Sequence, residues 1–325
     1  MAGTFAHLTL VDKLCRDAAA LDGIDTLTLA MKAALKNFRP FCELGAISPD
    51  APYLQLLSGD ASRWANVMHY WKTADFVRHA IPLVFNMDFR LAETQKCLAW
   101  LFGYAAHLVT DLTIHPVVKV RVGSYDQNKR MHRLCEINQD VYIFHKQGFG
   151  DITTAEYIDG CGIKSCADPD DRGKLDPAVR ALWSDCLKGY PTGSISMKNA
   201  LPAPEHDPDP DAWFRHYVRL LDKFVEDGGV SPILLRNISE VAGLVYPRFS
   251  DLDMMFINNL EIPGEGEPTN YGDVFDRTRQ NTLSTWRELG AALDKGDQDL
   301  FRLSNCDLDT GRDDNNRLIF WEGMT

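Results

Sequence analysis

The segment Leu101–Pro116 carries the residues of this sequence that are best placed to do chemistry together. His107, Asp111 and His115 follow one another at intervals of four within it. Residues four apart on an α-helix lie on the same side, so these three side chains are expected to project from one face. Two imidazoles and a carboxylate are costly to bury without partners, and together they are ligands that suit zinc. The alternative is a partly exposed helix with a polar stripe.

A second set of potential ligands has the same spacing in residues 127–146. His132, Glu136 and Asp140 again stand four apart. His132 and Glu136 can offer an imidazole and a carboxylate to a common point. Asp140 is available as a third ligand, or as a residue that orients the ligands from outside.

Three further residues are candidate ligands. His7 stands at the start of a predicted helix, His69 lies in the middle of another, and Asp50 lies in a loop between Pro49 and Pro52. A carboxylate held between prolines can be a rigid ligand, or it can serve only as a turn residue. No Gly-rich phosphate loop, Ser-His-Asp signature or dinucleotide-binding fingerprint competes with these residues.

Apolar residues recur at helical spacing through most of the chain, and no convincing strand alternation or repeat occurs. The fold is therefore predicted to be all-α, as a single large multi-helix domain over residues 1–325. Residues 148–211 are rich in Gly, Pro, Asp and Ser and are predicted to form an irregular excursion. Residues 44–53 are predicted to be a turn-rich loop. The helices are expected at residues 7–22, 26–37, 61–80, 88–112, 127–146, 177–188, 211–227, 231–245, 250–260 and 271–294.

Two prolines and one acidic residue mark expected helix boundaries. Asp88 is a potential N-cap of the helix that carries His107. Pro116 is expected to end or kink that helix, because proline lacks a backbone N–H. Pro40 is expected to follow the end of the helix at 26–37.

The composition is that of a globular protein with enough apolar residues for a large core, at 325 residues and 45% hydrophobic. The net charge of −12 gives no general attraction to nucleic acid, so no stable nucleic-acid complex is expected. The eight cysteines contain no C-x-x-C pair, so no Cys-rich zinc site is visible. The sequence does not indicate an oligomeric state.

The N-terminal residues lack a basic segment followed by a long apolar run, so no secretory signal peptide is predicted. No segment is expected to reach the ~18 apolar residues that a membrane-spanning helix needs. A cytoplasmic location with reduced thiols is therefore expected, and Cys161 and Cys166 are not expected to form a required disulfide. Export by a route that uses no signal peptide is the alternative.

Five motifs stand in a fixed order along the first half of the chain. They are Gly3–His7, Leu44–Asp50, His69, Gly103–His115 and His132–Glu136. Their order resembles that of zinc-dependent phospholipase C, a family that shares its all-helical fold with the S1/P1 nucleases. The Asp-x-x-x-His spacing of the fourth motif and the His near the N-terminus look more like the glycosylphosphatidylinositol-specific phospholipase D branch.

The resemblance implies two or three zinc ions, each with its own ligands. One zinc would be held by Asp50, His69, His107 and Asp111. A second would be held by His115, His132 and Glu136. A third would be held by His7, by Asp111 as a bridge, and by the amino group and carbonyl of the first residue, which is Ala2 if Met1 is removed.

The resemblance also implies hydrolysis of a phosphoester by a zinc-bound hydroxide, with a phospholipid or a lipid-linked phosphodiester as substrate. Asp50 would orient or deprotonate the attacking water, and Asp140 would lie outside the ligands. The side of the phosphate that is cleaved, C-type or D-type, stays open. One alternative is a nuclease or phosphatase that uses the same metal site. The other is a non-catalytic helical module, stapled by metal, that binds a partner.

Overall fold

The computed structural model describes residues 3–55, 58–152, 162–189, 202–226, 245–264 and 267–321. Within these residues nearly all secondary structure is helical, and the exceptions include two strands of two residues each. The predicted all-α class is therefore confirmed. The single domain over residues 1–325, with an excursion at 148–211, stays a prediction.

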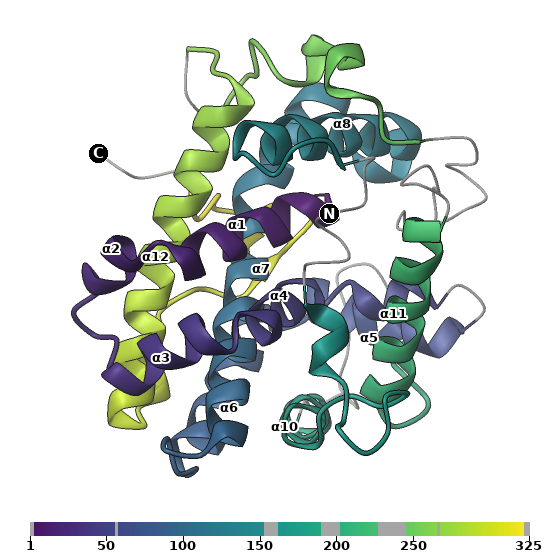
Figure 1. The fold of residues 1–325 in the computed structure, drawn as a ribbon. Coiled ribbons are helices and arrows are strands. Elements are labelled where there is room, and N and C mark those ends of the chain that lie inside the picture. Colours follow the sequence, from purple (N-terminus) through teal and green to yellow (C-terminus); the bar gives the residue numbers. More distant parts are fainter. Residues whose placement is uncertain are drawn as a thin grey trace.

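Helix α7 (Ala92–Val122) runs through the middle of the protein, and other helices pack around it (Figure 1). Every residue from Cys97 to Val118 is buried. A helix that is apolar on all sides is stable only inside a protein or a membrane. By length and hydropathy α7 is apolar enough to cross a membrane, contrary to the expectation from the sequence. Its apolar window is entirely buried by the rest of the protein, as in the core helix of a globular domain.

Helix α4 (Arg39–Ile47) crosses α7 with backbone against backbone. A Cβ atom at Gly45 would lie 2.0 Å from the carbonyl oxygen of Trp100, and one at Gly103 would lie 2.0 Å from the carbonyl oxygen of Cys42. Real side chains do not make contacts this short, so the crossing requires glycine at both positions. Residues 44–47 belong to α4, so the prediction of a loop at 44–53 is wrong for these residues.

The predicted helix at 7–22 is two helices, α1 (Thr4–Arg16) and α2 (Ala18–Asp22). The Asp17 carboxylate accepts a hydrogen bond from the N–H of Ala20 at 2.9 Å and so caps the second helix. The spacing of the apolar residues continues through this break, which is why it did not reveal the cap.

The predicted helix at 61–80 is also two helices, α5 (Gly59–Tyr70) and α6 (Thr73–Phe85). Lys72 separates them with a φ of 45°, in the left-handed region. A non-glycine residue is uncommon there, and only the surrounding packing can hold it. The break turns the chain directly after His69.

Pro116 does not end helix α7, which continues to Val122 with the proline inside it. Proline in a helix interior costs ~3 kcal/mol because it removes a hydrogen bond and clashes with the preceding turn. The next residues, Val117 and Val118, are each 1% exposed, and their burial offsets part of this cost. The N-cap of α7 is Leu91 and not Asp88.

The segment at 250–260 holds two short 3-10 helices, η6 (Phe249–Asp251) and η7 (Met254–Phe256), in place of an α-helix. The helix predicted at 231–245 lies outside the described residues except for its last position. The remaining helices are α3 (Leu29–Asn37), η1 (Ala51–Leu54), α8 (Tyr125–Lys146), η3 (Ile163–Cys166), α10 (Pro177–Lys188), α11 (Pro210–Glu226), α12 (Tyr271–Lys295) and η8 (Gln298–Leu300).

Residues 301–321, here called the C-terminal segment, pack across α7 and the end of α5. Strand β1 (Cys306–Asp307) pairs antiparallel with strand β2 (Arg312–Asp313). Between them, the N–H of Leu308 donates to the carbonyl oxygen of His69 at 3.0 Å. The indole N–H of Trp321 donates to the carbonyl oxygen of Thr113 in α7 at 2.9 Å. These hydrogen bonds fix the segment beside the predicted metal ligands.

The cysteines in the described residues are all buried free thiols, and Cys166 is one of them. Cys161 lies outside the described residues. The absence of a required disulfide between these two therefore stays a prediction.

Candidate metal centre

Four elements bring six of the predicted ligands together at the middle of α7. That helix supplies His107, Asp111 and His115 from one face, as their spacing predicted. Helix α1 supplies His7 and α5 supplies His69. Asp50 lies in the turn after α4. The crossing of α4 and α7 holds these pieces in one place, because Gly103 in the crossing lies one helical turn before His107.

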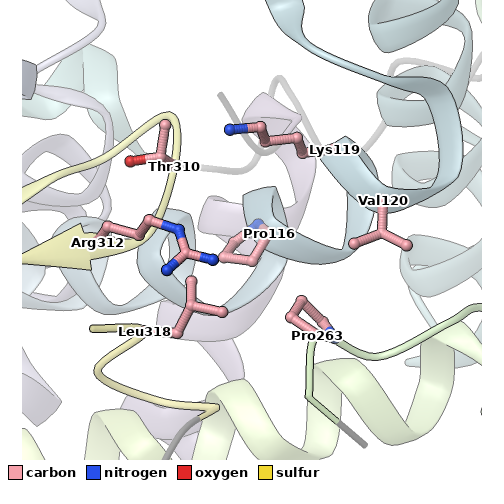
Figure 2. A pocket seen from close by; sticks show the side chains of 7 residues that line it. All are labelled: Pro116, Lys119, Val120, Pro263, Thr310, Arg312 and Leu318. Carbon is pink, nitrogen blue, oxygen red and sulfur yellow. The ribbon is translucent and has the colours of Figure 1, made fainter. Parts of the chain in front are cut away.

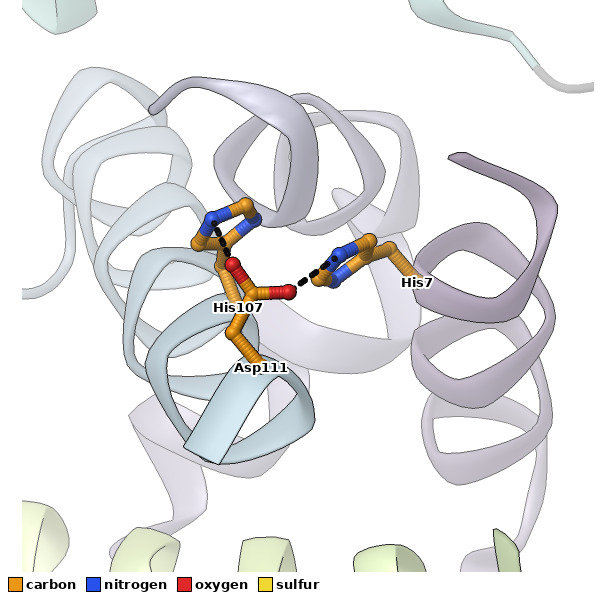
Figure 3. A group of neighbouring side chains, drawn as sticks. All are labelled: His7, His107 and Asp111. Atoms are coloured by element: carbon orange, nitrogen blue, oxygen red, sulfur yellow. Dashed lines mark ion pairs between the residues drawn. The ribbon is translucent and has the colours of Figure 1, made fainter. Parts of the chain in front are cut away.

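Asp111 is the common neighbour of these imidazoles. Its Oδ1 atom lies 3.2 Å from His7 Nε2 and 3.3 Å from His115 Nε2. Its Oδ2 atom lies 3.3 Å from His107 Nε2 and 3.9 Å from His69 Nε2. Figure 3 shows His7 and His107 each beside a different oxygen of this carboxylate, and their rings stack with centroids 4.3 Å apart.

The ligand atoms form two groups that share His107. One group is His7, His107 and Asp111, and the other is Asp50, His69 and His107; within each, the candidate ligand atoms lie within 4.8 Å of one another. All five residues are buried.

The spacing and the unused atoms fit zinc. Two ligands at ordinary zinc distances and tetrahedral angles are about 3.3 Å apart. The separations of Asp111 from His7, His107 and His115 are 3.2 to 3.3 Å. The Nε2 atoms of these three imidazoles are buried and make no hydrogen bond within the described part of the chain. Burial of a nitrogen atom without a hydrogen-bond partner destabilises the folded protein unless a cation binds that atom.

Two imidazoles are oriented from behind by backbone carbonyl groups. His107 Nδ1 donates to Ala46 O at 2.8 Å, and His69 Nδ1 donates to Ala65 O at 2.7 Å. In neutral rings Nε2 then carries the lone pair and faces the centre. His69 Nε2 lies 3.1 Å from Asp50 Oδ1. Two lone pairs repel at that distance, so a second proton or a cation must lie between them.

The electrostatics of the centre favour a bound cation. Burial raises the pKa values of Asp50 and Asp111, but nearby imidazoles outweigh burial and leave both below their ordinary values. Burial lowers the pKa of His115 to about 4, and burial followed by the proximity of His107 lowers that of His7. Burial also lowers the pKa of His107, but Asp111 and Asp50 outweigh it and raise the value. Charged carboxylates and mostly neutral imidazoles are the forms that bind metal.

The structure does not gather His115, His132 and Glu136 into one group of close ligand atoms. His132 Nε2 lies 2.7 Å from the carbonyl oxygen of Gly123, so only its Nδ1 is available to a metal. Glu136 accepts a hydrogen bond from Arg133 Nη1 at 2.6 Å. These two residues as ligands of a second zinc therefore stay a prediction. Ala2 lies outside the described residues.

Asp140 holds the N-terminus of helix α1. Its Oδ1 accepts from the N–H of Ala6 at 2.8 Å and its Oδ2 from that of Phe5 at 3.2 Å. The hydroxyl of Tyr246 donates to Oδ2 at 3.3 Å. A Cβ atom at Gly3 would lie 2.2 Å from the carboxylate, so glycine leaves room for it. Burial raises the pKa of Asp140 to about 8. This carboxyl group therefore acts on His7 by fixing α1, whereas its predicted place beside the zinc ligands stays a prediction.

One acidic residue near the centre was not found from the sequence. Asp309 Oδ1, in the C-terminal segment, lies 3.8 Å from His115 Nδ1. The hydroxyl of Tyr70 donates to its other oxygen. The surrounding residues are polar and turn-forming, and such a pattern gives no sign of a buried partner.

A cavity of about 230 Å³ lies between α7 and the C-terminal segment (Figure 2). Pro116, Lys119 and Val120 line one side of it, and Thr310 and Arg312 line another. None of the predicted metal ligands lines this cavity.

A comparison with known protein families identifies a match to this chain. A family model described as zinc-dependent phospholipase C matches residues 6–193, more than half of the chain. No curated protein and no solved structure matches the chain. The matched range includes every predicted side-chain ligand from His7 to Glu136, whereas Asp309 lies beyond it.

Proposed function

The chain belongs to the zinc-dependent phospholipase C family, and from that premise we propose that it hydrolyses a phosphodiester bond of a phospholipid or a lipid-linked phosphodiester. Family membership and the two His/Asp groups support a zinc-dependent phosphoester hydrolase. The substrate class and the number of ions, two or three, are part of the proposal.

One observation carries the proposal more than any other. Two groups of buried ligands share His107, and Asp111 Oδ2 of one group lies 3.9 Å from His69 Nε2 of the other. Both groups are built from imidazole and carboxylate without cysteine. Structural zinc sites are usually closed and rich in Cys, whereas catalytic sites use His and carboxylate and keep an open position. The composition of this centre therefore favours catalysis over a purely structural role.

The family resemblance names the residues that would hold zinc, and the two groups contain five of them. Asp50, His69, His107 and Asp111 would hold one ion, and His7 with Asp111 would hold another. Zinc bound there would lower the pKa of a bound water and stabilise negative charge on the phosphoryl oxygens. His115, His132 and Glu136 would complete the set, as the family resemblance implies.

Asp50 is the residue best placed to act on the attacking water. Its side chain keeps 9% of its surface exposed, while those of His69 and Asp111 are at 0%. Burial raises the pKa of Asp50, but the hydrogen bond with His69 and the charges of His107 and His69 together outweigh burial and leave the pKa below the ordinary value. A carboxylate of low pKa is a weak base, so we expect it to orient the water more than to deprotonate it.

Metal analysis combined with three substrates tests the proposal. Zinc per chain is measured by mass spectrometry on the purified protein. Hydrolysis is then followed on p-nitrophenylphosphorylcholine, phosphatidylcholine micelles and single-stranded DNA. We expect bound zinc, turnover of the two choline esters and no turnover of DNA. Release of phosphocholine would identify C-type cleavage, and release of choline would identify the D-type cleavage of the branch named above.

Two results would overturn the proposal. Cleavage of DNA alone would identify a nuclease. Stoichiometric zinc without turnover of any phosphoester would identify a helical module in which the metal has only a structural role. His107→Ala serves as the inactive control in both assays, because His107 belongs to both ligand groups.

A further inference from the structure

We propose that Asp309 is a positioning residue of the metal centre, which holds the imidazole of His115 from its outer side. The inference rests on the proposed function, since it takes His115 to be a zinc ligand. It adds to the centre a residue from outside the range that the family model matches.

The ring of His115 lies between two carboxylates. Its Nε2 atom is 3.3 Å from Asp111 Oδ1, on the side of the centre. Its Nδ1 atom is 3.8 Å from Asp309 Oδ1, on the opposite side. The ring is therefore turned so that Nε2 is available to a metal, and Nδ1 is left for a partner from the C-terminal segment.

Asp309 differs from the groups that face the second ring nitrogens of the other predicted ligands. Asp309 is a charged carboxylate, whereas those groups are uncharged backbone carbonyls. His107, His69 and His132 each direct one ring nitrogen at a backbone carbonyl oxygen, at 2.8, 2.7 and 2.7 Å. Metal-binding imidazoles commonly direct their second nitrogen at such a group, which fixes the tautomer and the ring orientation. A carboxylate in that place also makes the imidazole a stronger ligand. The same arrangement predicts tighter binding of the ion that His115 holds.

The carboxylate of Asp309 is held firmly in position. The hydroxyl of Tyr70 donates to its Oδ2, and its own N–H donates to Asp307 Oδ1 at 2.9 Å. The N–H of the preceding Leu308 donates to the carbonyl oxygen of His69, as described above. Asp309 is thus tied to the helix end that presents another predicted ligand, which a random surface carboxylate would not be.

The present separation of 3.8 Å is longer than a hydrogen bond. A direct N–H···O bond to His115 needs the two atoms to approach by about 1 Å. The Asp309 side chain keeps 20% of its surface exposed, so it is not locked on every side.

Four variants and one double variant test the inference. Zinc affinity is measured by competition with a chelator, and the Tm of the metal-free protein is measured separately. Asp309→Ala should weaken the binding of one zinc by about tenfold to a hundredfold, as loss of an outer partner does. Asp309→Asn keeps an acceptor and should lose less. Tyr70→Phe removes one support of the carboxylate and should lose least. Asp314→Asn, an exposed acid of the same segment, is the matched control and should bind zinc like the wild type.

The double variant asks whether Asp309 acts through His115. In a His115→Ala background, Asp309→Ala should cause no further loss of zinc affinity, because the partner it positions is gone. An equal loss in both backgrounds would overturn the inference, and so would wild-type zinc affinity in Asp309→Ala. If Asp309→Ala does not fold, Asp309→Asn and Tyr70→Phe carry the test. A wild-type protein that binds no zinc would sink the proposed function itself, whereas a zinc-binding wild type with unchanged Asp309 variants would sink only this inference.

Discussion

The Nδ1 atom of His107 lies 2.8 Å from the carbonyl oxygen of Ala46, directly beside the place where α7 crosses α4. Gly45 and Gly103 form that crossing, with room for no side chain at either position. The imidazole shared by the two ligand groups is thus set by the approach of two backbones. Any change that separates the helices should move His107 and its outer partner apart.

Substitution at the crossing should harm both folding and metal binding. The added methyl group of Gly103→Ala would meet backbone atoms of α4, which cannot rotate away as a side chain can. We expect a loss of ~1–3 kcal/mol in the free energy of unfolding, the usual cost of overpacking, and weaker zinc binding. Thermal unfolding and metal analysis check this. Gly59→Ala is the control, because a Cβ atom there meets nothing within 4 Å. A Gly103→Ala protein as stable as Gly59→Ala would contradict the role of the crossing.

Removal of His107 should cost more metal than removal of His7. His107 belongs to both ligand groups and His7 to one. With a proton on Nδ1 the imidazole of His107 has one lone pair and binds one ion. We therefore expect His107→Ala to lose activity and the ion held with Asp50 and His69, and to weaken the ion beside His7 because Asp111 loses its neighbour. His7→Ala should keep the ion held by Asp50 and His69. Zinc per chain in the purified variants measures this. His206→Ala, at a side chain that is 79% exposed, is the control. Equal zinc in the two variants would refute the shared role of His107.

Two substitutions of Asp140 distinguish a helix cap from a charged group that acts on zinc. Asp140→Ala removes both acceptors at the start of α1 and should cost ~0.5–2 kcal/mol, as for other N-caps. It should also loosen His7. Asp140→Asn keeps an oxygen acceptor, so its stability and zinc content should lie near those of the wild type. Chemical unfolding and metal analysis of both variants provide the comparison. If Asn harms zinc binding as much as Ala does, the charge itself is needed and Asp140 is more than a helix cap.

The buried Glu43 should make stability depend on pH. Burial raises the pKa of Glu43 from 4.5 to about 9, although Arg39 lies 3.0 Å away and opposes this. The folded protein then keeps a proton that the unfolded chain loses. This contribution is complete below pH 4.5 and is lost as the pH rises toward 9. Unfolding experiments at pH 5 to pH 9 should show a steeper fall in stability for the wild type than for Glu43→Gln. Equal slopes would show that Glu43 titrates normally.

The sequence predicted the parts of the site that depend on local geometry. His107, Asp111 and His115 share a face because a helix repeats nearly every four residues, whatever surrounds it. The approach of His7 and His69 to α7 depends on tertiary packing. It could be expected only because the order of the motifs resembles that of a known family.

The parts that sequence analysis missed depend on packing between distant segments. Pro116 stays inside α7 because the next turn is buried in the core, and Lys72 holds its strained conformation because α5 and α6 both pack there. The partners of Asp140 and Asp309 lie more than a hundred residues away or on another element. A carboxylate in a cap or a turn looks the same in the sequence whether it faces water or an imidazole.

The position of Asp309 late in the chain also orders the biosynthesis of the centre. The residues from His7 to Glu136 leave the ribosome well before the C-terminal segment, and chains fold from the N-terminus as they are made. Since a domain generally folds as a unit, the centre is not complete until that segment has been made. A chain that ends before residue 309 would carry all the predicted side-chain ligands and would lack the carboxylate that is proposed to hold His115.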